Sequence, residues 1–251
     1  MNWPRLAALM VALPLAASAD DAVTNAPATA LMTRVLANRP VRDYSLKARL
    51  FVTPDNPVPV DILVSPRPGE VRTIYQAARM HLLVVQPEHG QARFYLRGTG
   101  ELKGAARMGG FLGSHFSYYD LGLPFLHWPD ATLAGDDRVR GRDCTVVEVR
   151  ADHEPYARVK LWIDKEYLAL LRAEAYDGND GLVKRVAIAS FKRIGDAWIP
   201  RGIDIAFVPK LQALPAEEKS RLEIYEGSPD AHFAPDQFSP ETFLRAPAAP
   251  P

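Results

Sequence analysis

An alternation of apolar and polar residues with a period of two is the feature that most constrains this chain. It is clearest over residues 156–163, where every second residue is apolar, as in a half-buried strand. A turn over residues 164–166 then reverses the chain into a second alternating segment, residues 169–176. Related patterns recur from residue 142 to residue 207. We therefore expect five consecutive antiparallel strands in this region, each burying one face.

The apolar face of these strands carries many small residues. Alanine stands at several positions where Val, Ile or Leu would normally fill the core of a sandwich. Two interpretations remain open: helices pack closely on the sheet there, or the face is an unfilled apolar concavity that receives a ligand. On the second interpretation, the expected cavity wall consists of Ala157, Val159, Leu161, Ile163, Leu171, Ala173, Ala175, Ala187 and Ala189.

The rest of the chain also favours strands. Short apolar segments separated by turns rich in Pro, Gly and Asn predict strands over residues 45–53, 59–65, 70–76, 80–86, 91–97 and 221–227. An amphipathic helix is expected between Pro27 and Pro40, over residues 28–38. Strands joined by short turns favour an antiparallel meander over a parallel sheet. The predicted fold class is therefore mainly β (α+β).

A long glycine-rich segment, residues 98–114, interrupts the strands. It matches neither of the glycine-rich phosphate-binding motifs, so we expect a mobile connection over the mouth of the sheet. The aromatic segment that follows, residues 116–128, predicts a short helix that covers the inner face of the sheet. The candidate lid residues are Met108, Phe111, Leu112, Phe116, Leu121, Phe125 and Trp128.

The first 19 residues have the organisation of a secretory signal peptide. Arg5 precedes an apolar run that is too short to span a membrane, and Ala17-Ser18-Ala19 is a typical cleavage site. The single cysteine, Cys144, is not at the cleavage point, so no lipid anchor is expected. We expect an exported, soluble periplasmic protein with one domain over residues 20–244 and a disordered tail over residues 245–251.

The composition argues against several classes of function. Thirty basic and thirty acidic residues give a net charge of zero, so a nucleic-acid partner is not expected. The six histidines lack metal-site spacing, and one cysteine cannot form an intrachain disulfide. We therefore expect no metal site and no cofactor.

Three sequence features could be mistaken for reactive or metal-binding sites. Ser114, His115 and Asp120 contain the letters of a catalytic triad, but no nucleophile elbow surrounds the serine. Residues 177–181 resemble the opening of a calcium loop but lack its final carboxylate, so a hairpin turn is predicted instead. Cys144 is expected to be a small buried apolar residue. None of these features indicates an enzyme.

A series of segments resembles a known family. The segments RMHLLVVQP, GGFLGSHFSYYDL, VRGRDCTVVEVRAD, YARVKLWIDKEYLALLRAEAYD and GLVKRVAIASFKRIGDAWIPRGIDI are similar, in order and spacing, to the outer membrane lipoprotein-sorting protein family. That family belongs to the LolA/LolB/RseB-like superfamily. The resemblance implies a curved, incompletely closed antiparallel β half-barrel with helices over its concave apolar face. It transfers no catalytic residues.

The same resemblance implies a function and partners. In characterised relatives the cavity takes acyl chains of lipoproteins or other lipids, and members often work beside inner-membrane transporters of the resistance-nodulation-division (RND) type. We therefore expect a non-catalytic carrier for lipids or lipoprotein acyl chains, with an RND-type transporter or an outer-membrane acceptor as its partner. The alternative is an RseB-like module that binds a protein partner and senses envelope stress. The chain differs from these relatives at His81, His115 and Tyr119.

Overall fold

One continuous antiparallel sheet forms the frame of the protein. The computed structural model describes residues 19–38, 40–53, 56–195, 197–208 and 219–245. Thirteen strands lie in these ranges, all in the same sheet. They are β1 Tyr44–Phe51, β2 Pro57–Arg67, β3 Glu70–Ala77, β4 Met80–Pro87, β5 Arg93–Leu96, β6 Gly100–Leu102, β7 Asp130–Val139, β8 Arg142–Arg150, β9 Arg158–Asp164, β10 Leu170–Tyr176, β11 Leu182–Ile194, β12 Ala197–Phe207 and β13 Lys219–Pro229.

One long helix and several short ones connect and cover the strands. They are α1 Ala19–Ala37, η1 Gly104–Met108, η2 Phe111–Gly113, α2 Tyr118–Gly122, η3 Pro124–His127 and α3 Pro240–Arg245, where η denotes a 3-10 helix.

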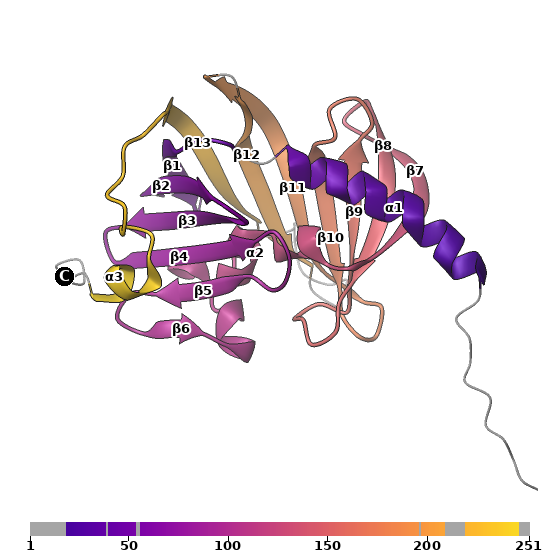
Figure 1. Ribbon diagram of the computed structural model, residues 1–251, viewed down its shortest axis with the longest axis horizontal. Helices are drawn as coiled ribbons and strands as arrows, with labels where there is room; N and C mark the ends of the chain where they lie inside the picture. Colours follow the sequence, from indigo (N-terminus) through magenta and orange to yellow (C-terminus); the bar gives the residue numbers. More distant parts are fainter. Residues whose placement is uncertain (1–18, 39, 54–55, 196, 209–218, 246–251) are drawn as a thin grey trace, which may run out of the picture.

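The sheet is a meander in two arms. Strands β1 to β6 run outward to one edge, and β7 to β13 return from the opposite edge until β13 pairs with β1. The edge strands β6 and β7 do not pair with each other, so the sheet curves without closing (Figure 1). The predicted fold, a curved and incompletely closed antiparallel half-barrel, is confirmed. The five strands expected between residues 142 and 207 are β8 to β12.

Two strands gave no recognisable signal in the sequence. β7 is an edge strand in which most residues are exposed, so its sequence shows no alternation between a buried and a solvated face. β6 has three residues and lies inside the glycine-rich segment. An exposed edge strand and a very short strand both lack the one-sided burial on which the pattern depends.

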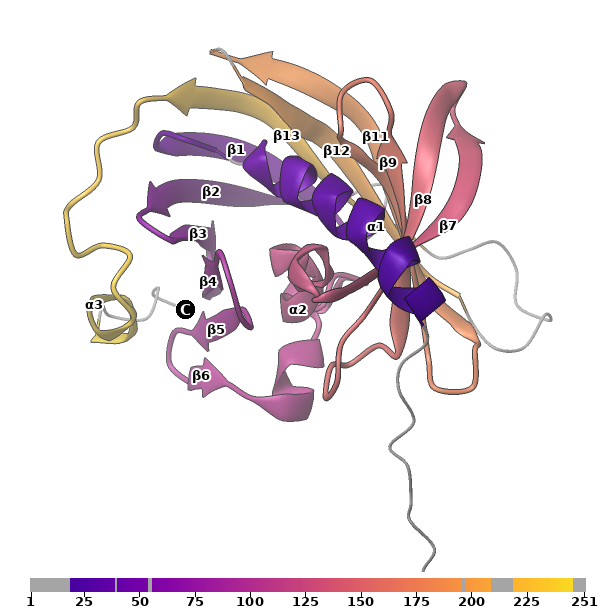
Figure 2. The same ribbon diagram turned by 45° about the vertical axis from the view of Figure 1, so that its right-hand side comes forward.

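Helices α1 and α2 lie within the curve of the sheet (Figure 2). α1 begins at Ala19 and contains Pro27, so the expectation that Pro27 starts the helix is wrong. A proline in a helix removes one backbone hydrogen bond, and here the packing of Ala28 and Met32 into the core offsets that loss. Both of these residues are at most 5% exposed.

The C-terminal segment covers the outer face of the arm formed by β1 to β6. Phe238 and Phe243 pack with residues of β2 to β5 in a second apolar cluster. Arg72 and Arg97 donate hydrogen bonds to the carbonyl oxygens of Phe238 and Phe243, at 2.9 and 3.1 Å. β4 is therefore buried on both faces, which explains its nearly continuous apolar sequence. Residues 1–18 of the predicted signal peptide and residues 246–251 of the predicted tail lie outside the described residues.

Candidate functional site

Five of the nine predicted cavity-wall residues line the inner, concave face of the sheet. They belong to the main apolar core together with α1 and α2, and none is more than 5% exposed. Strand register places them side by side, because Ala173 pairs with Leu161 and Ala175 pairs with Val159. The five are Val159, Leu161, Ile163, Ala173 and Ala175.

The other four predicted wall residues are not on the inner face. Ala157 is exposed and lies one residue before β9, which starts at Arg158. Leu171 packs in an outer cluster with Trp162, because the register of β10 against β9 shifts between Leu170 and Arg172. A residue displaced by such a shift moves to the opposite face of the sheet.

Ala187 and Ala189 are also on the outer side. Ala187 pairs with Arg172, whose guanidinium stacks on the outer-face residue Trp162. Ala189 lies at a register shift of β11 and lines an apolar pocket of about 210 Å³ on the outer face. Alternation along β11 puts Lys184 and Val186 on the inner face instead.

The concave face is covered by residues 104–128, which we call the plug. The plug comprises η1, η2, α2 and η3 and lies against the inside of the curved sheet (Figure 2). The glycine-rich segment contains β6, η1 and η2, so it is not the long irregular connection that its composition suggested. Five candidate lid residues are buried in the main core, and two, Met108 and Leu112, pack at its border. The buried five are Phe111, Phe116, Leu121, Phe125 and Trp128.

The plug fits the sheet closely. A Cβ atom added at Gly122 of α2 would lie 3.0 Å from Val84 and 3.1 Å from Phe94, so a larger residue there would press on both side chains. The hydroxyl of Tyr75 on β3 donates a 2.8 Å hydrogen bond to the carbonyl oxygen of Leu121. Burial raises the pKa of Tyr75, which keeps the hydroxyl protonated and able to donate.

A buried polar network lies beneath α2. Ser117 and Asp120 form a capping box at the start of the helix. The Asp120 carboxylate also accepts a 2.7 Å hydrogen bond from the Tyr156 hydroxyl and forms an ion pair with Lys184 on β11. Burial, followed by the Asp120 charge, raises the pKa of Tyr156. These contacts connect the plug to two strands of the sheet.

The small residues on the inner face make room for this network. Ala175 lies between Val159 of β9 and Lys184 of β11, so its small side chain adjoins the lysine that reaches Asp120. Two interpretations of this face were open: closely packed helices, or an unfilled concavity. The structure shows close packing, because the five inward-facing wall residues are buried under the plug and α1. Two surface pockets in the described part of the chain lie elsewhere, one beside Ala189 and one beside Asp136.

The sequence pattern did not predict the network. Alternation over residues 156–163 puts Tyr156 on the face opposite to Val159, Leu161 and Ile163, yet its hydroxyl bonds to the buried Asp120, and the pattern assigned no role to Lys184. The signal for Lys184 was present, because the series Lys184, Val186, Ile188 places a lysine on an otherwise apolar face. Such an inward lysine requires a buried anionic partner.

The three residue types of a catalytic triad, Ser114, His115 and Asp120, each bond to a different partner. Ser114 Oγ donates to the carbonyl oxygen of Phe111, and His115 contacts Ser220 Oγ through both its backbone N–H and its Nδ1 atom. Asp120 belongs to the network with Tyr156 and Lys184. Cys144 is buried in the outer cluster, as predicted, and burial raises the pKa of its thiol.

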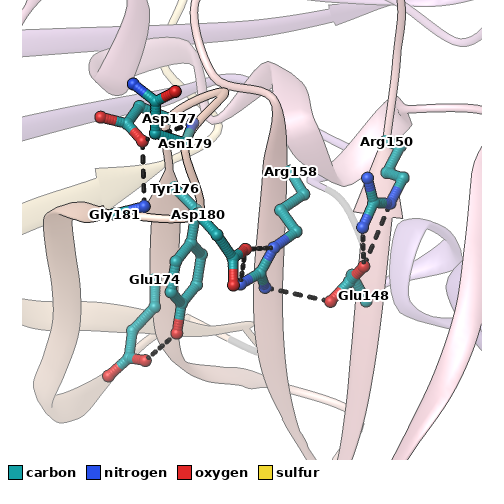
Figure 3. Close-up of polar contacts among 9 residues, drawn as sticks. All are labelled: Glu148, Arg150, Arg158, Glu174, Tyr176, Asp177, Asn179, Asp180 and Gly181. Atoms are coloured by element: carbon teal, nitrogen blue, oxygen red, sulfur yellow. Dashed lines mark hydrogen bonds and ion pairs between the residues drawn. The ribbon is translucent and has the colours of Figure 1, made fainter.

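The outer face of β8 to β10 carries a polar ladder (Figure 3). Arg158 Nε donates to Asp180 at 2.7 Å, its NH1 group donates to Glu148 at 3.0 Å, and its guanidinium stacks on Tyr176. The turn over residues 177–181 is a hairpin turn, as predicted. The Asp177 carboxylate accepts 2.9 Å hydrogen bonds from the N–H groups of Asn179 and Gly181. This ladder satisfies its own charges and stabilises the convex side.

Known proteins share this architecture. A family model whose description reads "-like: Uncharacterized protein" matches residues 80–245, about two thirds of the chain. A proposed outer membrane lipoprotein-sorting protein domain from Vibrio parahaemolyticus has a TM-score of 0.75 at 15% identity, covering 88% of this chain and 99% of that one. The chain belongs to the family that this model describes, and it shares its fold with the lipoprotein-sorting protein domain.

Two further solved structures are similar to this chain. A DUF1329 family protein from Desulfovibrio piger has a TM-score of 0.73 at 19% identity, covering 88% of this chain and 99% of that one. A LolA superfamily protein from Nitrosomonas europaea has a TM-score of 0.59 at 16% identity, covering 84% and 97%. No curated protein matches the chain. No helix in the described part of the chain combines the length and hydropathy that a membrane span requires.

Proposed function

We propose that this protein is a periplasmic carrier that binds lipids or lipoprotein acyl chains without covalent chemistry. The observation that carries the proposal is the covered apolar concavity. A curved sheet presents a continuous apolar inner face, and the plug that covers it is made of short helices and turns. The plug is joined to the sheet by a small number of buried polar contacts. On this proposal a ligand takes the place of the plug on the inner face.

The energetics of such an exchange are favourable. Removing an acyl chain from water is worth about 0.8 kcal/mol per CH₂ group, so a chain of about 16 carbons offers on the order of 12 kcal/mol. Displacing the plug exposes buried aromatic residues and breaks the Asp120–Lys184 ion pair, which opposes binding. The net affinity is therefore moderate, which suits a carrier that must release its ligand.

The proposal includes export and hand-over. Cleavage after Ala19 would place the mature chain in the periplasm, where an inner-membrane RND-type transporter or an outer-membrane acceptor would be its partner. A protein-interaction module of the RseB-like kind is the second candidate. The specific observation in its favour is that the concave face is filled in this structure.

Ligand co-purification separates these two functions. The chain is expressed with its N-terminal segment, isolated from the periplasm without detergent, and analysed by native mass spectrometry and solvent extraction. A carrier retains a stoichiometric lipid or binds fluorescent fatty acids and lipopeptides. If no lipid is retained and no probe binds above background, the carrier proposal is wrong and the interaction module is favoured.

A further inference from the structure

A small pocket opens on the convex face of the sheet, beside the first residues of β10. The pairing of β10 with β11 stops at Arg172 and Ala187, whereas β11 continues beside β12 as far as Ile194. Beyond Ala187, the side of β11 that faces β10 is therefore not paired with that strand. The apolar pocket of about 210 Å³ lies here, and we call it the convex pocket.

The turn between β7 and β8 forms one wall of the convex pocket. Val139 pairs with Arg142, so Arg140 and Gly141 form a two-residue hairpin loop, and both have positive φ angles, of 50° and 81°. These are the angles of a type I′ turn, in which Asn, Asp or Gly is preferred at the first position. Arg140 occupies that position instead, and its guanidinium donates a hydrogen bond to the carbonyl oxygen of Ala189 on β11. The turn therefore holds Arg140 against β11.

The interior of the convex pocket is apolar. Val139 and Leu171 are at most 5% exposed and belong to the outer apolar cluster, against which Phe191 packs. The register of β11 against β12 skips Ala189, and its methyl group is the smallest side chain of the lining. A small side chain at this irregular position leaves the space that the pocket occupies.

The rim of the convex pocket is cationic. The lining includes the exposed residue Arg140 and the partly exposed Arg142, and it contains no acidic residue. The charge of Arg142 is compensated, because its guanidinium forms ion pairs with Asp164 and, at 3.5 Å, with Glu166. The hydrogen bond of Arg140 goes to an uncharged carbonyl group, and no ion pair compensates its charge among the described residues. An anion beside Arg140 would supply the missing counter-charge.

We propose that the convex pocket binds a small carboxylate with an apolar body, and that the carboxylate pairs with Arg140. One N–H group of Arg140 bonds to Ala189, so the other N–H groups of the guanidinium can bond to a carboxylate, while the apolar interior accepts the rest of the ligand.

The size of the convex pocket limits the ligand. A water molecule occupies about 30 Å³ in the liquid, so the pocket has the volume of roughly seven water molecules. This volume suits a short-chain or single-ring acid and excludes a long acyl chain. The site is separate from the inner face of the sheet, so the inference goes beyond the proposed carrier function.

The test compares hexanoate with hexanamide, which has the same chain but no charge. Binding is measured by ligand-observed NMR and titration calorimetry at about pH 7.5, where a carboxylic acid is ionised. Hexanoate should bind at least about tenfold more tightly than hexanamide, because only the acid forms a charge-assisted pair with Arg140. Added salt should weaken the binding of hexanoate alone, because Arg140 is exposed.

Arg140→Asn removes the charge and suits the turn. Asparagine favours the left-handed conformation of residue 140, so the variant should fold, which thermal unfolding checks. It should bind hexanoate at least about tenfold more weakly and hexanamide almost as before. Arg138→Asn is the matched control, because Arg138 lies on the same hairpin and pairs with Asp143 but does not line the pocket. This variant should bind hexanoate like the wild type.

Two further variants locate the site. Ala189→Val reduces the space in the convex pocket and should weaken the binding of hexanoate and hexanamide alike, with thermal unfolding as the check that it folds. Ala173→Phe fills the inner face and should leave both affinities unchanged, because Ala173 lies in the main core and not in the convex pocket.

The possible results separate this inference from the carrier function. Equal binding of hexanoate and hexanamide, or an Arg140→Asn variant that binds like the wild type, would refute the role of Arg140. If hexanoate does not bind at millimolar concentrations, the convex pocket is a packing gap, and the inference fails while the carrier function stands. Loss of hexanoate binding in Ala173→Phe but not in Arg140→Asn would place the ligand on the inner face, which overturns the inference and favours the carrier.

Discussion

Lys184 of β11 and Asp120 of α2 form an ion pair inside the apolar core, although they are 64 residues apart in the chain. Their side chains are 10% and 2% exposed, so neither charge is solvated by bulk water. Within the described residues, the pair is the ion pair that joins the plug to the inner face of the sheet. It should therefore control both the stability of the closed form and its opening.

Removing one partner of this ion pair should destabilise the protein strongly. Lys184→Met leaves the Asp120 carboxylate buried without its cation, and we expect a loss of about 3–5 kcal/mol in the free energy of unfolding, measured by urea denaturation. Asp120→Asn/Lys184→Met removes both charges and retains an amide oxygen for Tyr156, so it should recover a large part of the loss. Arg201→Ala, which breaks a surface ion pair with Glu223, is the control and should cost less than about 1 kcal/mol. Equal losses for Lys184→Met and Arg201→Ala would contradict a structural role for the buried pair.

A disulfide between the plug and β13 should block ligand binding. Ser220 Oγ lies 3.0 Å from the backbone nitrogen of His115, and this proximity suits the pair His115→Cys/Ser220→Cys. The oxidised protein should bind fluorescent fatty acids at least about tenfold more weakly than the reduced protein, because the plug cannot leave the inner face. Native Cys144 is buried, and burial raises its pKa, so it should not compete.

The two single-cysteine variants, treated with the same oxidant, are the controls for this cross-link. Tight binding by the fully oxidised double variant would show that ligands enter without displacement of the plug.

Filling the inner face should affect ligand binding, whereas filling the outer face should not. Ala173→Phe adds a ring to a packed core, so we expect a loss of about 1–3 kcal/mol in unfolding free energy together with loss of lipid binding. Ala187→Phe makes the same change on the convex side, and its effect on stability should stay within about 1 kcal/mol, with normal binding. Urea denaturation and probe titration measure the two effects. The reverse pattern would place the ligand site on the convex face.

Protonation of His81 should weaken the protein below about pH 6.5. Burial, then the charge of Arg97, lowers the pKa of this histidine, so the unfolded chain binds the proton more readily than the folded one. The stabilisation is complete above the unfolded pKa and is lost as the pH falls towards the lowered value. Arg97 also holds the C-terminal segment through the carbonyl oxygen of Phe243.

His81→Gln tests this assignment, because glutamine does not titrate. The difference in urea midpoint between the wild-type protein and His81→Gln should change between pH values of about 7.5 and 5.5, with the wild type losing more stability. A difference that is the same at both pH values would show that His81 does not contribute to the pH dependence.

Period-two alternation identified most strands because each of them buries one face and solvates the other. It failed where that condition fails. β7 is an exposed edge, and the register shift in β10 moved Leu171 to the outer face. The Ala187 and Ala189 assignments failed because the inner face of β11 is defined by its pairing with β10 and β12, which the sequence of β11 does not encode by itself. The residues of the inner face could therefore be assigned only once the pairing register of β10 and β11 was known.

The sequence by itself determined the class of fold, an antiparallel half-barrel with apolar segments to cover it, because strand periodicity and turn residues are local properties of the chain. The Asp120–Lys184 ion pair and the hydrogen bond from Tyr156 to Asp120 were decided only by the tertiary structure. Their members come from segments up to 64 residues apart and are brought together by the curvature of the sheet and the path of the plug. Whether a buried charge stabilises the fold depends on the opposite charge beside it, and only the folded chain shows which residue supplies that charge.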